Sequence, residues 1–122
     1  MDDQGSDRRR GEPPPDLIQL YLGLLKKGPT WTAVSSLELE SNQQQHLLGL
    51  QRLREAGNLL LAGPTPDGSD LRGILILRAD SMEEAEFLMQ GDPHLQTNRL
   101  TLELHPLYLS ASVLAQPLIP EA

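Results

Sequence analysis

His46 is the residue of this chain whose type and position most favour acid–base chemistry. At about 100° per residue it lies within about 40° of Leu50 and Leu53 on a predicted helix, so it points from the apolar face toward a sheet. An imidazole has an unperturbed pKa of about 6.5 and can act as general acid or base near neutral pH. The alternative is a core histidine that only donates a hydrogen bond to a backbone carbonyl.

Asp92 is the second candidate, and it has a structural explanation of its own. Asp92 followed by Pro93 is typical of a short helical turn, with the aspartate as N-cap and the proline at the first helical position. Such a cap contributes about 0.5 to 2 kcal/mol. A carboxylate oxygen that also reached His46 would fix the tautomer of the imidazole and stabilise its charged form. The distance between the two side chains therefore decides between an acid–base pair and two structural residues.

Glu103 and His105 lie two residues apart in an alternating segment, so they share one face of a predicted strand. Together with His46 they could form a metal site with two histidines and one carboxylate. We favour the alternative, in which Thr101, Glu103 and His105 line the polar part of a dimer interface or cleft. No metal is therefore expected.

Arg72 has the same strand parity as Ile74 and Ile76. An arginine there is either a clamp for a ligand carboxylate or a partner in a salt bridge between subunits. We favour the salt bridge.

Gly63 and Pro64 could bring backbone close to a ligand, although Gly-Pro after a strand is also ordinary turn chemistry. The spacing of Gly57, Gly63 and Gly68 does not fit a dinucleotide-binding motif, and no phosphate-binding glycine loop or nucleophile constellation is present. We therefore expect no cofactor. His94 is expected to be exposed.

Composition excludes several classes of function. Ten Lys and Arg stand against 17 Asp and Glu, and the net charge of −7 repels phosphate backbones, so nucleic-acid binding is not expected. The absence of cysteine excludes disulfides, thiolate metal sites and cysteine nucleophiles. The apolar run at 17–25 is shorter than the roughly 20 residues that span a bilayer, so no membrane association is expected. A cytoplasmic location is the default.

The 122 residues are sized for one domain. Residues 1–16 contain almost nothing to bury and are predicted to be a disordered leader. Residues 17–25 predict a strand, because the apolar run is short and lies between Pro15 and a Lys-Lys-Gly-Pro segment. A capping-box pattern at Ser41 and a glycine at the far end predict a helix over 41–56.

The rest of the chain predicts two more strands that pair as a hairpin, at 58–62 and 71–77, and a second helix at 81–90. Clean alternation predicts a fourth strand at 100–104. The domain is expected to end at residue 109. The tail, residues 110–122, carries two prolines and either frays or lies across a neighbour.

The order β-α-β-β-α-β is typical of a ferredoxin-like α+β fold, with two helices on one face of a four-stranded antiparallel sheet. Residues 74–77 are apolar without alternation, so this strand needs cover on both of its sides. The sheet of a second subunit is the simplest cover. The sequence therefore predicts a homodimer, a dimeric α+β barrel with clefts between each sheet and its helices.

Several separated motifs in this order resemble the YciI-like (YCII-related) family, over residues 17–109. They are LKKGPTWT at Leu25–Thr32, HLLGLQRLREAGNLLLAGP at His46–Pro64, LRGI at Leu71–Ile74, GDP at Gly91–Pro93 and NRLTLELHPLY at Asn98–Tyr108. The resemblance implies the dimeric α+β barrel. It also implies that His46 and Asp92 match the histidine and aspartate regarded as the active-site pair of the family.

The resemblance implies a small-molecule activity, since one branch of the family includes dehydrochlorinases of chlorinated hydroxybenzenes and the wider barrel resembles muconolactone isomerases. This chain departs from the family at Gln43-Gln44-Gln45, where many members carry a basic residue just before the histidine. A substrate anion held by that residue elsewhere is not expected to be held that way here.

Our leading hypothesis is a lyase or isomerase that moves protons on a cyclic or phenolic substrate, with His46 as acid or base and Asp92 orienting it. The alternative is a non-catalytic dimeric module that binds a small ligand or serves as an accessory subunit. In that case His46 would only form a hydrogen bond to the ligand.

Overall fold

The computed structural model describes residues 16–117 and 119. The predicted order of strands and helices is confirmed, including the short helical turn expected after Asp92, and one further short helix follows the last strand. The elements are β1 (Leu17–Lys27), α1 (Leu37–Glu55), β2 (Leu59–Pro64), β3 (Leu71–Leu77), α2 (Met82–Met89), α3 (Pro93–Gln96), β4 (Leu100–Ser110) and α4 (Ala111–Leu114). Residues 1–15 of the predicted leader, and 118 and 120–122 of the tail, lie outside the described residues.

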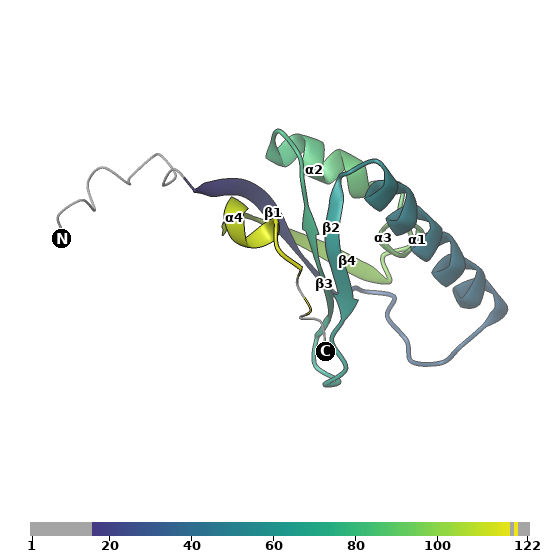
Figure 1. Cartoon of the computed structure of the whole chain (residues 1–122). Coiled ribbons are helices and arrows are strands. Elements are labelled where there is room, and N and C mark those ends of the chain that lie inside the picture. The colour runs from purple at the N-terminus through teal and green to yellow at the C-terminus, as the bar shows by residue number, and fades with distance from the viewer. Residues whose placement is uncertain (1–15, 118, 120–122) are drawn as a thin grey trace.

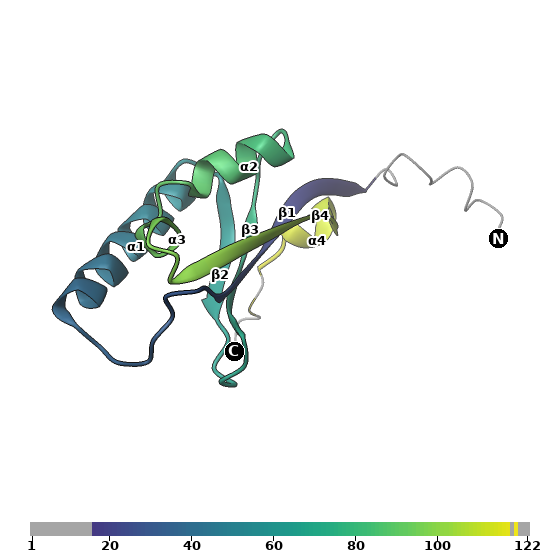
Figure 2. The ribbon, with the colours of Figure 1, turned by 180° about the vertical axis from the view of Figure 1, so that it is seen from behind.

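The four strands form one antiparallel sheet in the order β2-β3-β1-β4. Figures 1 and 2 show α1, α2 and α3 on the same side of this sheet. The chain therefore has the ferredoxin-like α+β fold expected from the sequence. Among the described residues, no helix has both the length and the apolar character needed to cross a membrane.

A mainly aliphatic core fills the space between the sheet and its helices. Leu75 and Leu77 of β3 have no exposed surface, and each such leucine contributes about 1.5 to 3 kcal/mol through burial. The neighbouring positions of the central strands alternate to the other side, which we call the open face. The buried core residues are Tyr21, Leu25, Leu59, Leu75, Leu77, Ala85, Met89 and Leu100.

The predicted start of α1 at Ser41 is wrong. The helix begins at Leu37, and its N-cap is Ser36, whose Oγ accepts a hydrogen bond from the backbone N–H of Leu39 at 3.1 Å. Glu38 and Glu40 then lie in the first turn, where carboxylates interact favourably with the helix dipole. Ser41 therefore continues a helix that has already begun.

Two other helix ends agree with their sequence signals. Gly57 follows α1 in a left-handed conformation with φ of 84°, which glycine adopts without steric cost. Ser81 caps α2 by accepting from the N–H of Glu84 at 3.0 Å.

The strands extend further than the sequence predicts, because β1 reaches Lys27, β2 reaches Pro64 and β4 continues to Ser110. The expected end of β4 at Leu104 is wrong. Pro106 lacks a backbone N–H, but β4 is an edge strand, where a missing donor need not break a ladder.

The part of the predicted tail that is described is ordered at its start. It forms α4, and the N–H of Ala111 donates to the carbonyl of Asp16 at 2.7 Å. The Ser110 and Ser112 hydroxyls donate to the Asp16 carboxylate and lower its pKa. The start of β1 and the end of β4 are therefore tied together.

Candidate active site

His46 is the buried residue of α1, with 9% of its surface exposed, whereas the leucines one and two turns further along the helix are only half-buried. The predicted position of His46 on the inner face of the helix is thus confirmed. Its ring nitrogen Nδ1 forms a hydrogen bond with Oδ2 of Asp92, which comes from the start of α3. The two side chains are 10% and 7% exposed, so the pair is largely shielded from water.

Asp92 has both of the roles that the sequence suggested as alternatives. One oxygen, Oδ1, accepts from the backbone N–H of His94 at 2.8 Å and caps α3, while the other binds His46. Burial alone raises the pKa of Asp92, but the hydrogen bond and charge of His46 and the His94 N–H outweigh it and lower that pKa. An ionised Asp92 accepts from Nδ1 and therefore leaves Nε2 of His46 for other partners.

The expectation that His94 is exposed is wrong, because only 3% of its surface is accessible. α3 packs against α1 and brings the His94 ring to 5.0 Å from the ring of His46. Its Nε2 lies 2.8 Å from Oε1 of Gln43, so the N–H of a neutral ring donates to that amide oxygen. Burial first, and then the charge of His46, lower the pKa of His94. His94 is therefore held in its neutral form.

A cavity of about 340 Å³ lies between α1 and the sheet, next to this pair. His46 lines it, and His46 Nε2 has no hydrogen-bond partner among the described residues. Three leucines of the sheet, Leu25, Leu75 and Leu100, give the cavity an apolar surface. The atom that can exchange a proton with a small molecule is thus Nε2 of His46, while Asp92 lies behind the imidazole and acts as a positioning residue.

Arg72 lines the cavity too, which corrects the parity argument that placed it with Ile74 and Ile76. Leu25 of β1 pairs with Gly73 of β3, but the next residue of β1, Lys26, pairs with Leu71. Arg72 is therefore the extra residue of a β-bulge. A bulge redirects the side chain. The guanidinium carbon of Arg72 lies 4.7 Å from the centre of the Trp31 ring, and that of Arg99 lies 4.2 Å from it. Arg72 therefore faces the cavity, and the salt bridge between subunits that we favoured is not supported.

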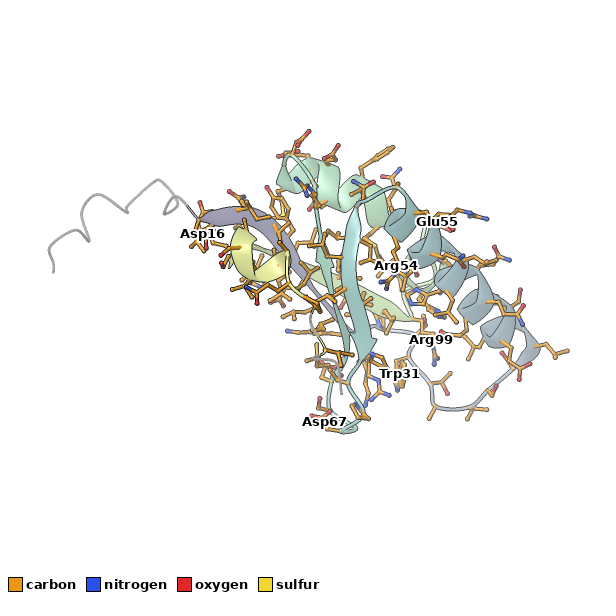
Figure 3. All side chains as sticks on the ribbon, in the orientation of Figure 1. Asp16, Trp31, Arg54, Glu55, Asp67 and Arg99 are labelled. Atoms are coloured by element: carbon orange, nitrogen blue, oxygen red, sulfur yellow. The ribbon has the colours of Figure 1, made fainter. Side chains whose placement is uncertain are left out.

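The segment after β1 is fastened to the segment before β4, and this fixes Trp31 beside Arg99. The N–H of Gly28 donates to the carbonyl of Arg99 at 2.8 Å, and the N–H of Thr30 donates to the carbonyl of Asn98 at 3.0 Å. A side chain at Gly28 would collide with the Asn98 backbone, so this close approach requires glycine. Figure 3 shows Trp31 and Arg99 together between the sheet and the segment leading into α1.

Gly63 and Pro64 line the same cavity, at the end of β2. Glu103 and His105 are not among the residues that line it, so they do not join His46 in this cavity. Their strand parity places them on the open face, where Glu103 binds Lys26 at 2.9 Å and also binds His105. Lys26 first, and then His105, lower the pKa of Glu103. Within residues 16–117 and 119, no three potential ligand residues lie close enough to hold a metal ion, so the proposed metal triad is not formed.

Sequence reasoning missed Trp31, Gln43, His94 and Arg99 as members of this site. For Gln43 a signal existed, because it lies three residues before His46 and hence on the same face of the helix. Trp31 is the only tryptophan in the sequence and follows a Gly-Pro turn, a position that could have been singled out. Nothing local points to Arg99, which reaches the cavity through contacts between segments far apart in the chain.

Comparison with known proteins finds one matching family and a similar solved structure. The sequence model of one protein family, the YCII-related domain, matches residues 20–102 of this chain. A solved structure of 5-chloro-2-hydroxyhydroquinone dehydrochlorinase (TftG) from Burkholderia phenoliruptrix AC1100, in complex with 2,5-dihydroxybenzoquinone, is similar to this chain with a TM-score of 0.53 and 25% identity. The similarity covers 70% of this chain and 90% of that one. A comparison with the curated proteins finds no match.

Proposed function

Since this chain belongs to the YCII-related family, we propose that the cavity beside His46 is the active site of a small-molecule lyase or isomerase. The observation that carries the proposal is the hydrogen bond from His46 Nδ1 to a buried Asp92, which leaves Nε2 at the cavity without a partner among the described residues. A histidine with one nitrogen held by a carboxylate and the other free has the arrangement of a general base or acid. Asp92 would hold the tautomer and stabilise the imidazolium that forms during the reaction.

The proton transfer can be written with this chain's own residues. Nε2 of His46 takes a proton from a carbon or hydroxyl of the bound molecule, and the electron pair left behind enters the ring system. In a lyase this electron pair expels a leaving group, whereas in an isomerase the proton returns to another atom. Neutral His94 beside His46 adds no positive charge that would oppose protonation of the base.

The solved neighbour supports this class of reaction. TftG is described as a dehydrochlorinase, and its complex holds 2,5-dihydroxybenzoquinone, a flat ring. The cavity of about 340 Å³ is at the small end of the volumes of ligand pockets, which suits a molecule with a single ring. We therefore place the substrate among small cyclic compounds.

Incubation of a panel of hydroxylated, chlorinated and carboxylated one-ring compounds in D₂O tests the proposal. NMR spectra of the compounds measure the exchange. We expect deuterium incorporation or elimination with at least one compound. His46→Ala is expected to lower the rate by about 10²- to 10⁴-fold, the usual contribution of general acid–base catalysis. The matched control is Gln45→Ala, an exposed neighbour on the same helix, which is expected to keep the wild-type rate.

Two outcomes would contradict this function. Equal rates in His46→Ala and wild type would remove His46 from the chemistry. Binding of panel compounds without exchange or elimination would instead favour the non-catalytic alternative, a ligand-binding or accessory module.

The homodimer is part of the proposal, and the open face of the sheet supports it. Leu61 and Ile74 lie on this face and expose 38% and 37% of their surface, so apolar area remains that a second sheet could cover. Leu24 lies between Ile74 and Glu103 on the same face, and Leu24→Glu would place two carboxylates side by side. We expect a dimer for the wild type and a monomer for Leu24→Glu in sedimentation measurements. A monomeric wild type would contradict the dimer.

A cytoplasmic location also stays a prediction.

A further inference from the structure

The Trp31 ring is surrounded by positive charge. The Arg99 and Arg72 guanidinium carbons lie 4.2 and 4.7 Å from its centre, and Nζ of Lys27 lies 5.6 Å from it. One stacked arginine would be ordinary packing, since cation–π contacts occur at such distances. Because both guanidinium groups lie within 5 Å of one ring centre, they are less than about 9 Å from each other, and their positive charges add at this end of the cavity.

Neither arginine forms an ion pair with a carboxylate in the part of the chain that the structure describes. The ion pairs there are Lys26–Glu103, His46–Asp92 and His105–Glu103. Asp67 interacts with Arg72 only at longer range: hydrogen bonds from Ser69 come first in lowering the pKa of Asp67, and the charge of Arg72 comes last. Arg99 donates to the carbonyl of Thr32 at 2.7 Å, and Arg72 makes a long contact of 3.4 Å with the carbonyl of Ser69. A guanidinium has five N–H donors, so most donors of both groups have no partner among the described residues. In a chain with a net charge of −7, two arginines that form no ion pair among the described residues suggest an anion from outside the chain.

Both arginines line the cavity that also contains His46. They enter it from the sheet side, Arg72 through the bulge in β3 and Arg99 from the residue before β4, whereas His46 enters it from α1. Leu25 and Leu75 form an apolar surface in the same cavity. The cavity thus combines a cationic group of side chains, an apolar surface and a base.

We propose that the substrate is a planar organic carboxylate with one ring, and that Arg72 and Arg99 hold its carboxylate group. The planar fork of an arginine matches a carboxylate with two parallel hydrogen bonds. The apolar ring would lie against the leucines, with an acidic hydrogen at Nε2 of His46. This inference rests on the proposed function in placing the reaction at His46, and it names the class of molecule that the site selects.

The clamp also fits the chemistry of proton removal. When His46 takes a proton from a carbon conjugated to the carboxylate, the electron pair spreads onto the carboxylate oxygens, and the proton stays on Nε2 until it is returned. Negative charge at those oxygens is larger in the transition state than in the bound substrate. Two fixed guanidinium groups therefore stabilise the transition state more than the ground state.

Calorimetric titration with benzoate and with benzamide, a neutral molecule of nearly the same shape, tests the clamp. We expect benzoate to bind at least about tenfold more tightly, because hydrogen bonds to a charged group are stronger than neutral ones. Arg72→Gln and Arg99→Gln are each expected to weaken benzoate binding by about 10- to 100-fold and to leave benzamide binding little changed. Arg78→Gln is the matched control, because Arg78 is an exposed arginine outside the cavity.

Three results would overturn the clamp: no benzoate binding, equal binding of benzoate and benzamide, or unchanged benzoate affinity in both arginine variants. Circular dichroism checks that Arg99→Gln is folded. If it is not, Arg72→Gln and Arg99→Lys carry the test, and the lysine is expected to bind benzoate more weakly than the arginine because it lacks the fork.

The clamp and the proposed function fail in different ways. A preference for benzoate that His46→Ala retains, with no turnover of any compound, would support the clamp and contradict the enzyme. Turnover of neutral ring compounds that depends on His46, without a preference for benzoate, would contradict the clamp alone.

Discussion

Two substitutions at Asp92 separate the two roles of its carboxylate. In Asp92→Asn the side-chain oxygen can still accept from the His94 N–H, and asparagine is about as good an N-cap as aspartate. The charge that holds His46 is lost. In Asp92→Ala both the cap and the bond to His46 are lost.

The structure sets the expected size of each effect. The His46 and Asp92 side chains are 10% and 7% exposed, so solvent screens their bond little. A hydrogen bond to a charged group contributes about 1.5 to 3 kcal/mol and a neutral one about 0.5 to 1.5, so we expect Asp92→Asn to lower the free energy of unfolding by about 1 to 1.5 kcal/mol. Loss of the cap adds to the loss of the bond, so we expect about 2 to 5 kcal/mol for Asp92→Ala.

Urea denaturation of the three proteins measures these differences, and its pH dependence adds a check on sign. The pKa of folded Asp92 is lowered, chiefly by His46 acting against burial. Its carboxylate therefore stabilises the fold above the ordinary aspartate pKa of about 3.9, and this stabilisation is lost as the pH falls through the folded value. We expect the difference between wild type and Asp92→Asn to narrow below about pH 4. Equal losses in both variants, or a difference that widens in acid, would refute the assigned roles.

Three further predictions concern single residues. Burial, and then the charge of His46, lower the pKa of His94. The free energy of unfolding of the wild type is therefore expected to fall as the pH drops below about 6.5. Urea unfolding of His94→Asn is expected to show a smaller fall over the same pH range. Ser36→Ala is expected to cost about 0.5 to 2 kcal/mol in thermal unfolding and Ser41→Ala less than about 0.5, whereas equal costs would contradict the N-cap. Leu75→Ala is expected to cost about 2 to 5 kcal/mol and exposed Leu47→Ala less than about 0.5 by the same measurement, and a small cost at Leu75 would contradict its place in the core.

Local patterns predicted those parts of the site that depend on one element. The position of His46 followed from helical spacing, and the cap at Asp92 followed from the Asp-Pro pair, because both are decided within a few residues. The contact between the side chains of His46 and Asp92 depends on how α3 packs against α1, and no local sequence pattern contains that packing. The burial of His94 follows from the same packing, and it was missed for the same reason.

The sequence offered Arg72 as a carboxylate clamp only as an alternative, because the position of the cationic side chains depends on irregular backbone. Strand alternation assigns Arg72 to the open face, and only the register shift beside Leu25 turns it toward Trp31. Arg99 reaches the same ring through hydrogen bonds between segments about seventy residues apart, such as that from Arg99 to Thr32. The helix start was missed because Ser36 and Ser41 both precede residues that suit a first turn.

A double-mutant cycle on the deuterium exchange rate tests the central claim most directly, namely that His46 and Asp92 act as one unit. We expect His46→Ala to lower the rate by about 10²- to 10⁴-fold and Asp92→Asn to lower it by a smaller factor. The double variant is then expected to be no slower than His46→Ala, because Asp92 acts only through the imidazole. A double variant slowed by the product of the two factors, or an Asp92→Asn enzyme as fast as wild type, would contradict the account.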